Sequence, residues 1–169
     1  MFATAAPHKY STPGIIPRYA QKSGTVCWGA AVANIYDWKK RTRRTATAAL
    51  ADIGSRWETL YNAGDYLEGP VFKELASDAG LKPFPIGDFR DDLVWMDTIR
   101  KQGPLLILQK AAGAWTHWIV ISGYEYDSSS KLWIEYVDAA DGLKYSETAD
   151  AIYEKSLDAR TQISKVWGY

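Results

Sequence analysis

Cysteine occurs once in this sequence of 169 residues, at position 27, and histidine occurs twice. A single cysteine excludes a disulfide within the chain, and with it the small secreted scaffolds that disulfides hold together. One cysteine and two distant histidines also cannot supply the ligands of an ordinary zinc site, so we expect no metal. Stability must therefore come from packing, to which eight tryptophans and eleven tyrosines contribute large side chains.

The sequence also lacks an excess of either charge. The formal net charge is +0, from 20 basic and 20 acidic residues, which gives no reason to expect nucleic acid or a membrane as a partner. No run of about 18 apolar residues predicts a transmembrane helix, and residues 1–17 lack the basic and apolar regions of a signal peptide. We therefore expect a protein that works inside a cell or is exported by another route, or one domain of a longer polypeptide.

What is present is typical of a globular domain. Apolar residues make up 47% of the chain and charged residues 24%. Residues 1–20 are rich in proline, threonine and alanine and have no clear period, so we expect an extended N-terminal arm. A single domain is expected over residues 21–169.

Helical and strand patterns divide the domain into two parts. Apolar residues at three- and four-residue steps, with capping residues, predict helices over 27–41, 46–53, 70–78 and 91–101. The segment 57–69 is predicted to be a loop with short turns. β-branched and aromatic runs then predict strands at 104–109, 117–126, 132–138 and 161–169, with a short helix over 147–155. Helices followed by strands indicate an α+β fold.

The sole cysteine stands in the sequence QKSGTVCW, at the expected start of the first helix. A thiol at a helix N-terminus lies near free backbone N–H groups and the positive end of the helix dipole, and both favour the nucleophilic thiolate. Such a nucleophile needs a base, usually histidine. His8 lies in the proline-containing arm, whereas His117 opens the strongest strand pattern of the chain. Cys27 and His117 are therefore the candidate nucleophile and base.

Two further residues complete a candidate site. Asp138 ends the second strand of a predicted hairpin, and in an antiparallel pair the start of one strand lies beside the end of its partner. We therefore expect Asp138 to lie next to His117 and to hold its tautomer. Gln21, six residues before Cys27, can donate a side-chain N–H to the oxyanion that forms when a carbonyl is attacked, together with the backbone N–H of Cys27.

The pattern around the cysteine resembles that of the papain-like cysteine protease superfamily: Gln21, then five residues, then Cys27-Trp28. The segments GPLLIL, THWIVISGY and LWIEYVDAADG resemble its histidine- and Asp/Asn-bearing strands, and the similarity spans roughly residues 18–145. The short chain without disulfides resembles the compact bacterial branch, which includes plant-pathogen effector proteases and toxin domains of interbacterial competition systems. The resemblance implies a papain-like α+β fold, with a helical half that carries the nucleophile helix packed against a twisted antiparallel sheet.

The resemblance also implies roles for a cofactor-free protease: the nucleophile Cys27, the base His117, the orienting Asp138 and the oxyanion donor Gln21. Small bacterial members often have proline after the aspartate, where this chain has Ala139. Asp141 therefore stays open as a second candidate for orienting the histidine. The serine- and glycine-rich approach to the cysteine is only partly kept, as Ser23 and Gly24.

Each of these residues also has a purely structural interpretation. A lone cysteine is often a small buried hydrophobe, and a histidine on a strand is often a hydrogen-bonded core residue. Three tryptophans flank the candidate site and are predicted either to pack in the core or to form the walls of a substrate cleft: Trp28, Trp115 and Trp118. Trp28 is expected to do both. The basic run KKRTRR at residues 39–44 is predicted to be a solvated helix end, with docking onto an acidic partner as the alternative.

The expected function is the cleavage of a protein substrate by a bacterial effector or toxin domain. Such a domain would be exported by a specialised secretion system and act in the cytoplasm of a target cell. Its producer would need a cognate immunity protein, expected to plug the cleft. Deamidation, transglutamination and cleavage of a peptidoglycan amide use the same residues and stay open, as does a non-catalytic binding module on this fold.

Overall fold

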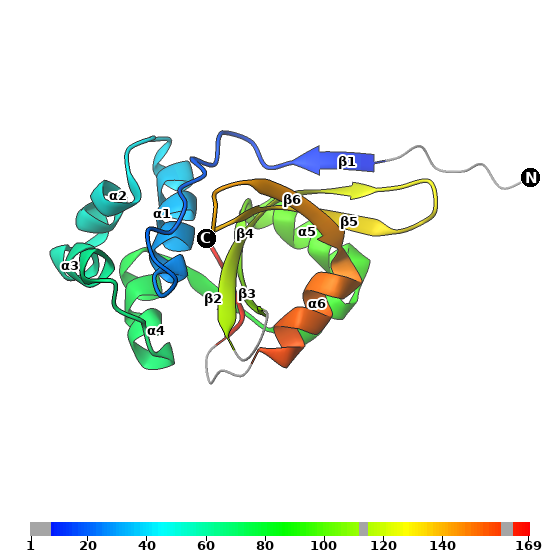
Figure 1. The fold of residues 1–169 in the computed structure, drawn as a ribbon. Coiled ribbons are helices and arrows are strands. Elements are labelled where there is room, and N and C mark those ends of the chain that lie inside the picture. The colour runs from blue at the N-terminus through cyan, green and yellow to red at the C-terminus, as the bar shows by residue number, and fades with distance from the viewer. Residues whose placement is uncertain (1–7, 112–114, 160–163) are drawn as a thin grey trace, which may run out of the picture.

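Six α-helices and seven strands are found in the parts of the chain that the computed structural model describes, residues 8–111, 115–159 and 164–169. One group of helices lies on one side of a sheet, and α5 and α6 lie on the other (Figure 1). The helices are α1 (Cys27–Lys40), α2 (Ala46–Ile53), α3 (Ser55–Ala63), α4 (Gly69–Asp78), α5 (Asp92–Gln102) and α6 (Ala149–Asp158), with a 3₁₀ turn at Ile86–Arg90. The strands are β1 (His8–Ser11), β2 (Lys82–Phe84), β3 (Leu105–Lys110), β4 (Thr116–Tyr126), β5 (Leu132–Asp138), β6 (Lys144–Thr148) and β7 (Val166–Gly168).

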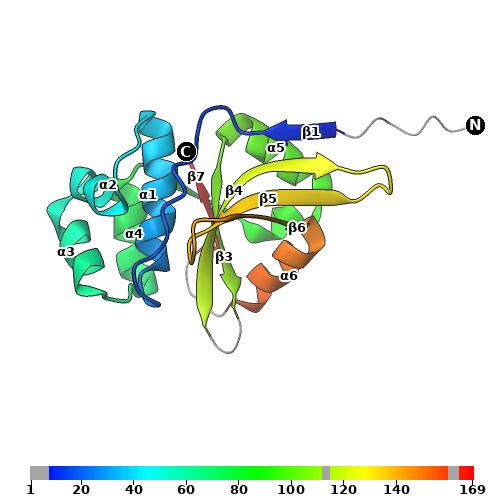
Figure 2. The same ribbon diagram turned by 45° about the horizontal axis from the view of Figure 1, so that its top comes forward.

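The sheet is antiparallel throughout, with the strand order β2-β7-β3-β4-β5-β6 and β1 paired with the far part of β4. The segment that follows β1 runs back alongside α1 before the helix begins (Figure 2). A bulge in β4 falls between Ile121 and Gly123. At Gly123 a side-chain Cβ would lie 2.4 Å from the carbonyl oxygen of Tyr10, so only glycine lets β1 approach this closely. Mixed helices and antiparallel sheet make this an α+β protein.

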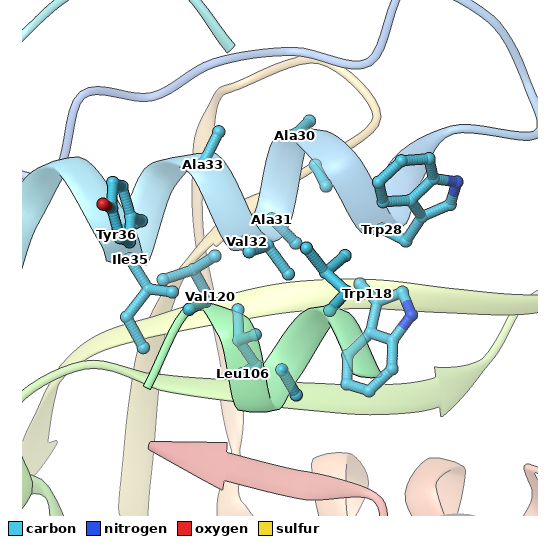
Figure 3. Close-up of a cluster of buried hydrophobic side chains, with 14 of the residues drawn as sticks. Trp28, Ala30, Ala31, Val32, Ala33, Ile35, Tyr36, Leu106, Trp118 and Val120 are labelled. Atoms are coloured by element: carbon cyan, nitrogen blue, oxygen red, sulfur yellow. The ribbon is translucent and has the colours of Figure 1, made fainter. Parts of the chain in front are cut away.

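Alternate residues of β3 and β4 serve two hydrophobic clusters, as the two-residue period of a strand requires. Leu106 and Val120 face α1, whose side chains cover them (Figure 3). Their neighbours Ile107 and Ile119 belong to the second cluster, with residues of α5 and α6. The sheet is thus buried on both faces, and α1 is held against it along most of its length. No helix among the described residues is long and apolar enough to cross a bilayer.

The predicted helices at 27–41, 46–53, 70–78 and 91–101 and the predicted hairpin are confirmed within two residues at their ends. The prediction of a loop over 57–69 is confirmed for residues 64–68 but is wrong for residues 57–63, because α3 occupies Ser55–Ala63. Trp57 and Tyr61, four residues apart, form its buried face, and this spacing is the helical period. Gly64, at φ 82°, ends the helix in the left-handed region.

Three short strands were not predicted: β1, β2 and β6. They have three to five residues each, and their side chains are mostly exposed, so the alternation that marks a half-buried strand is weak. Residues 161–163 of the predicted last strand and 1–7 of the predicted arm lie outside the described residues. Within the rest, β7 begins at Val166 and β1 occupies part of the arm.

Candidate active site

Cys27 is the first residue of α1. The N-cap, Val26, makes no side-chain capping bond, and the backbone N–H groups of Cys27 and Trp28 find no acceptor among the described residues. They therefore remain free to donate to an anion at the positive end of the helix dipole. Cys27 is neither sealed in the core nor fully exposed.

The start of α1 is held close to α3 by a glycine. A Cβ at Gly29 would lie 2.2 Å from the ring of Tyr61, so a larger residue would push the two helices apart. The neighbouring Trp28 meets the same ring edge-on and donates from its indole to the carbonyl of Asp65, at 3.0 Å. These contacts fix the position and direction of the helix terminus that carries Cys27.

The imidazole of His117 lies against the carboxylate of Asp138, with 2.5 Å between Nε2 and Oδ1. The strand register explains the contact, because Asp138 pairs with Ile119 across the β4–β5 hairpin, two residues from the histidine. The same oxygen of Asp138 accepts from the backbone N–H of Ala140, at 2.7 Å. With Nε2 engaged, Nδ1 is the ring nitrogen left to serve Cys27.

Opposing effects set the protonation of this pair. Burial lowers the pKa of His117, but hydrogen bonds with Asp138 and Cys27 and the charges of both residues outweigh it, and the pKa rises from 6.5 to about 9. Because a hydrogen bond with Cys27 is one cause of the raised pKa, the side chains of Cys27 and His117 are neighbours. Burial acts to raise the pKa of Asp138, but its hydrogen bonds to His117 and Ala140 outweigh this and lower it. At neutral pH the pair is therefore a carboxylate and an imidazolium.

Asp141, the second candidate for orienting the histidine, has other partners. Its carboxylate accepts from the backbone N–H of Leu143 at 2.8 Å and from the hydroxyl of Tyr145 at 2.6 Å. It therefore shapes the turn between β5 and β6, and Asp138 is the carboxylate that bonds to His117.

Gln21 is tied to the loop that follows Asp138, because its backbone N–H donates to the carbonyl of Ala139 at 2.7 Å. Its side-chain oxygen is buried without a hydrogen-bond partner, and within the described residues no acceptor is found for its amide nitrogen. The segment from Gln21 to Cys27 is further held where Thr25 donates from its hydroxyl to the carbonyl of Gly64. Gln21 thus has a free side-chain N–H on the segment that leads into Cys27.

A small hollow of about 40 Å³ adjoins the sulfur. Trp28 and Trp118 both line it, and both also belong to the core (Figure 3); Trp118 stacks on Phe72 with 4.3 Å between ring centroids. Trp115 is 71% exposed and does not contribute to the described lining. Part of the wall comes from α4 and the segment before it, where no sequence pattern indicates a role at the site: Tyr66, Leu67, Gly69 and Phe72.

One family model matches most of the chain. Residues 12–158 match the family described as papain-like cysteine protease AvrRpt2. The chain belongs to this family. The matched range spans the positions of the four candidate site residues, and the family identifies the protein as a cysteine peptidase of a bacterial effector branch of the papain-like proteases. No curated protein and no solved structure gives a match.

Proposed function

We propose that this papain-like protein is an endopeptidase that cleaves a protein substrate with Cys27 as its nucleophile. The observation that carries the proposal is the bond between His117 and Asp138 next to the sulfur at the start of α1. A buried structural cysteine would need neither a charged histidine beside it nor the free N–H groups of a helix terminus. Both are features of an activated thiol.

In the first half of the reaction, the Cys27 thiolate attacks the substrate carbonyl carbon. The side-chain N–H of Gln21 and the backbone N–H of Cys27 donate to the oxyanion, whose negative charge develops only in the transition state. The imidazolium of His117 then gives its proton to the leaving amine as the C–N bond breaks. An acyl-enzyme thioester and a free amine result.

In the second half, water replaces the amine. His117, now neutral, takes a proton from the water, whose oxygen attacks the thioester carbonyl. The tetrahedral intermediate collapses, the C–S bond breaks, and the substrate acid leaves while the thiolate–imidazolium pair is restored. Asp138 keeps Nε2 protonated throughout, so that Nδ1 always faces the sulfur. No step needs a cofactor.

The biological setting is part of the proposal. We infer an effector or toxin that leaves its producer through a specialised secretion system and acts in the cytoplasm of a target cell. A producer that can be attacked by its own enzyme needs a cognate immunity protein, and plugging the hollow beside Cys27 is the direct way to block it. Expression of the wild type should then slow the growth of a sensitive host, whereas Cys27→Ala should not.

The deciding experiment is the identification of new protein N-termini in a target-cell lysate treated with wild type or with Cys27→Ala. New N-termini that appear only with the wild type establish proteolysis. Intact masses of treated proteins separate the other acyl transfers: two fragments mean cleavage, whereas a gain of about one dalton means deamidation of a glutamine. A lysate without fragments or mass changes would contradict the proposal.

A further inference from the structure

A second concave surface lies along the segment between β1 and α1, at the end of α1 opposite to Cys27. It consists of a hollow of about 570 Å³ beside Trp38 and another of about 250 Å³ beside Ser122. Gly14 and Ile15 line both, so the two hollows adjoin at these residues. Together they are called the basic groove below.

Charge is distributed unevenly around this groove. Its described lining has five basic side chains and no carboxylate: Arg18, Lys39, Arg41, Arg43 and Lys144. Arg41, Arg43 and Lys144 have no ion-pair partner among the described residues. In a chain with as many acidic as basic residues, a concave surface of one sign attracts ligands of the opposite sign.

Specific contacts hold the segment that forms the groove in place. The indole N–H of Trp38 donates to the carbonyl of Pro13 at 2.6 Å and fastens the segment to α1. Gly14, at φ 88°, allows the turn that follows, with Trp38 3.3 Å from the place of a Cβ. In the smaller hollow, Ser122 is 4% exposed and its hydroxyl has no hydrogen-bond partner. A buried polar group without a partner is costly unless a ligand satisfies it.

The apolar side chain of Ile15 lies where the two hollows adjoin. Ile15 is 64% exposed, although its neighbour Ile16 is buried in the core. A large aliphatic group surrounded by cations suits a ligand that combines carboxylates with an apolar side chain. Polypeptide offers this combination, whereas a nucleic acid offers phosphates and flat bases, for which the groove has no exposed aromatic platform beyond the partly buried Trp38.

We propose that the basic groove binds an acidic segment of the protein substrate that carries one apolar side chain against Ile15. The assignment to the substrate rests on the proposed protease function. Trp38 follows Cys27 by eleven residues, about 17 Å along α1 at 1.5 Å per residue. An extended substrate covers that distance in about five residues. The acidic segment therefore lies at least that far from the scissile bond, and it contributes to binding without touching the reacting atoms.

Binding is tested apart from cleavage, in the Cys27→Ala protein. The probe is a fluorescein-labelled twelve-residue peptide of glutamates with a central leucine, and the readout is fluorescence anisotropy at low and physiological salt. Arg41→Gln/Arg43→Gln should weaken binding at least fivefold, and Ile15→Ser should weaken the leucine peptide more than a leucine-free one. Lys82→Gln/Lys131→Gln, which removes two exposed cations outside the groove, should leave binding unchanged.

Three results would overturn the inference: no binding at low salt, equal weakening by the control variant, or tighter binding of a single-stranded oligonucleotide. A second assay connects the groove with catalysis. A cleavable peptide is compared with the same peptide extended by the acidic segment, and the ratio of their kcat/KM values should fall at least fivefold in Arg41→Gln/Arg43→Gln. An absence of cleavage would contradict the protease function and with it the assignment of the acidic segment to a substrate, whereas the anisotropy result for the groove itself would stand.

Discussion

The Nε2 atom of His117 lies 2.5 Å from Oδ1 of Asp138, in a hairpin whose register brings the start of one strand beside the end of the next. The contact commits the ring to one orientation, with its other nitrogen toward Cys27. It also raises the pKa of His117 to about 9 against the effect of burial. The first two predictions follow from this pair.

Asp138→Asn should lower the pKa of His117 from about 9 toward its ordinary 6.5, because the hydrogen bond to the carboxylate is the largest effect that raises it. The imidazolium protonates the leaving amine, so wild-type activity should fall as pH rises through about 9. In Asp138→Asn the fall should begin at least about one pH unit lower. NMR titration of the imidazole and the pH profile of kcat measure both quantities. Asp141→Asn is the matched control, and an equal shift there would contradict the assignment.

The same pair should make stability depend on pH. A histidine whose folded pKa is raised stabilises the protein fully below its unfolded value, near 6.5, and the effect is lost as pH rises through about 9. An aspartate whose pKa is lowered stabilises above about 3.9 and loses the effect as pH falls. The free energy of unfolding of the wild type relative to Asp138→Asn should therefore be greatest between about pH 4 and 6.5. Urea denaturation at several pH values measures it; a difference independent of pH would exclude this coupling.

Gln21→Ala should lower kcat roughly 100- to 1,000-fold with little change in KM, since an oxyanion donor acts in the transition state rather than on bound substrate. Its backbone bond to Ala139 does not depend on the side chain, so the melting temperature should change little. Lys22→Ala, on the same exposed segment, serves as the control. A variant of Gln21 with full kcat would remove the residue from the mechanism.

Gly142→Ala should destabilise the protein by about 1–3 kcal/mol. Gly142 has φ 71°, and a Cβ there would lie 2.4 Å from the carbonyl oxygen of Arg18, so both the backbone and the neighbour must shift. The loop after Asp138 would move with it, and kcat should fall as well. Gly87→Ala, where a Cβ meets nothing within 4 Å, should affect neither thermal unfolding nor kcat. Equal behaviour of the two variants would show that the close approach is unimportant.

The parts of the fold that sequence patterns predict are those whose signal is local. The buried face of α1 repeats every three or four residues, and β4 and β5 are long runs of β-branched and aromatic residues. The contact between His117 and Asp138 was also predictable, because hairpin pairing is a rule of geometry. The pairing of Cys27 with His117 was predicted from their chemistry and from the family resemblance rather than from a local pattern, since it depends on how α1 packs across the sheet.

Other features depend on distant contacts and left no local pattern. The wall of the hollow beside Cys27 comes from Tyr66 to Phe72, which only the docking of α4 brings to the site. Trp28, predicted to pack in the core and to line the cleft, does both, and Trp118, predicted to do one or the other, also does both. The edge strand β6 is too short and too exposed to show alternation. The bonds of Asp141 to Leu143 and Tyr145, which exclude it as the residue that orients His117, also have no local sequence pattern.

The place of β7 in the sheet has a consequence for how the enzyme comes into being. Residues 166–168 form β7, which lies between β2 and β3 in the sheet. β2 and β3 are more than twenty residues apart in the chain, and they are joined only through this strand from the C-terminal end. Such non-local pairing makes folding slow. The side chains of Cys27 and His117, ninety positions apart in the sequence, likewise come together only when the tertiary structure is complete. In an unfolded chain the candidate site is therefore absent, and it forms only when the whole domain has folded.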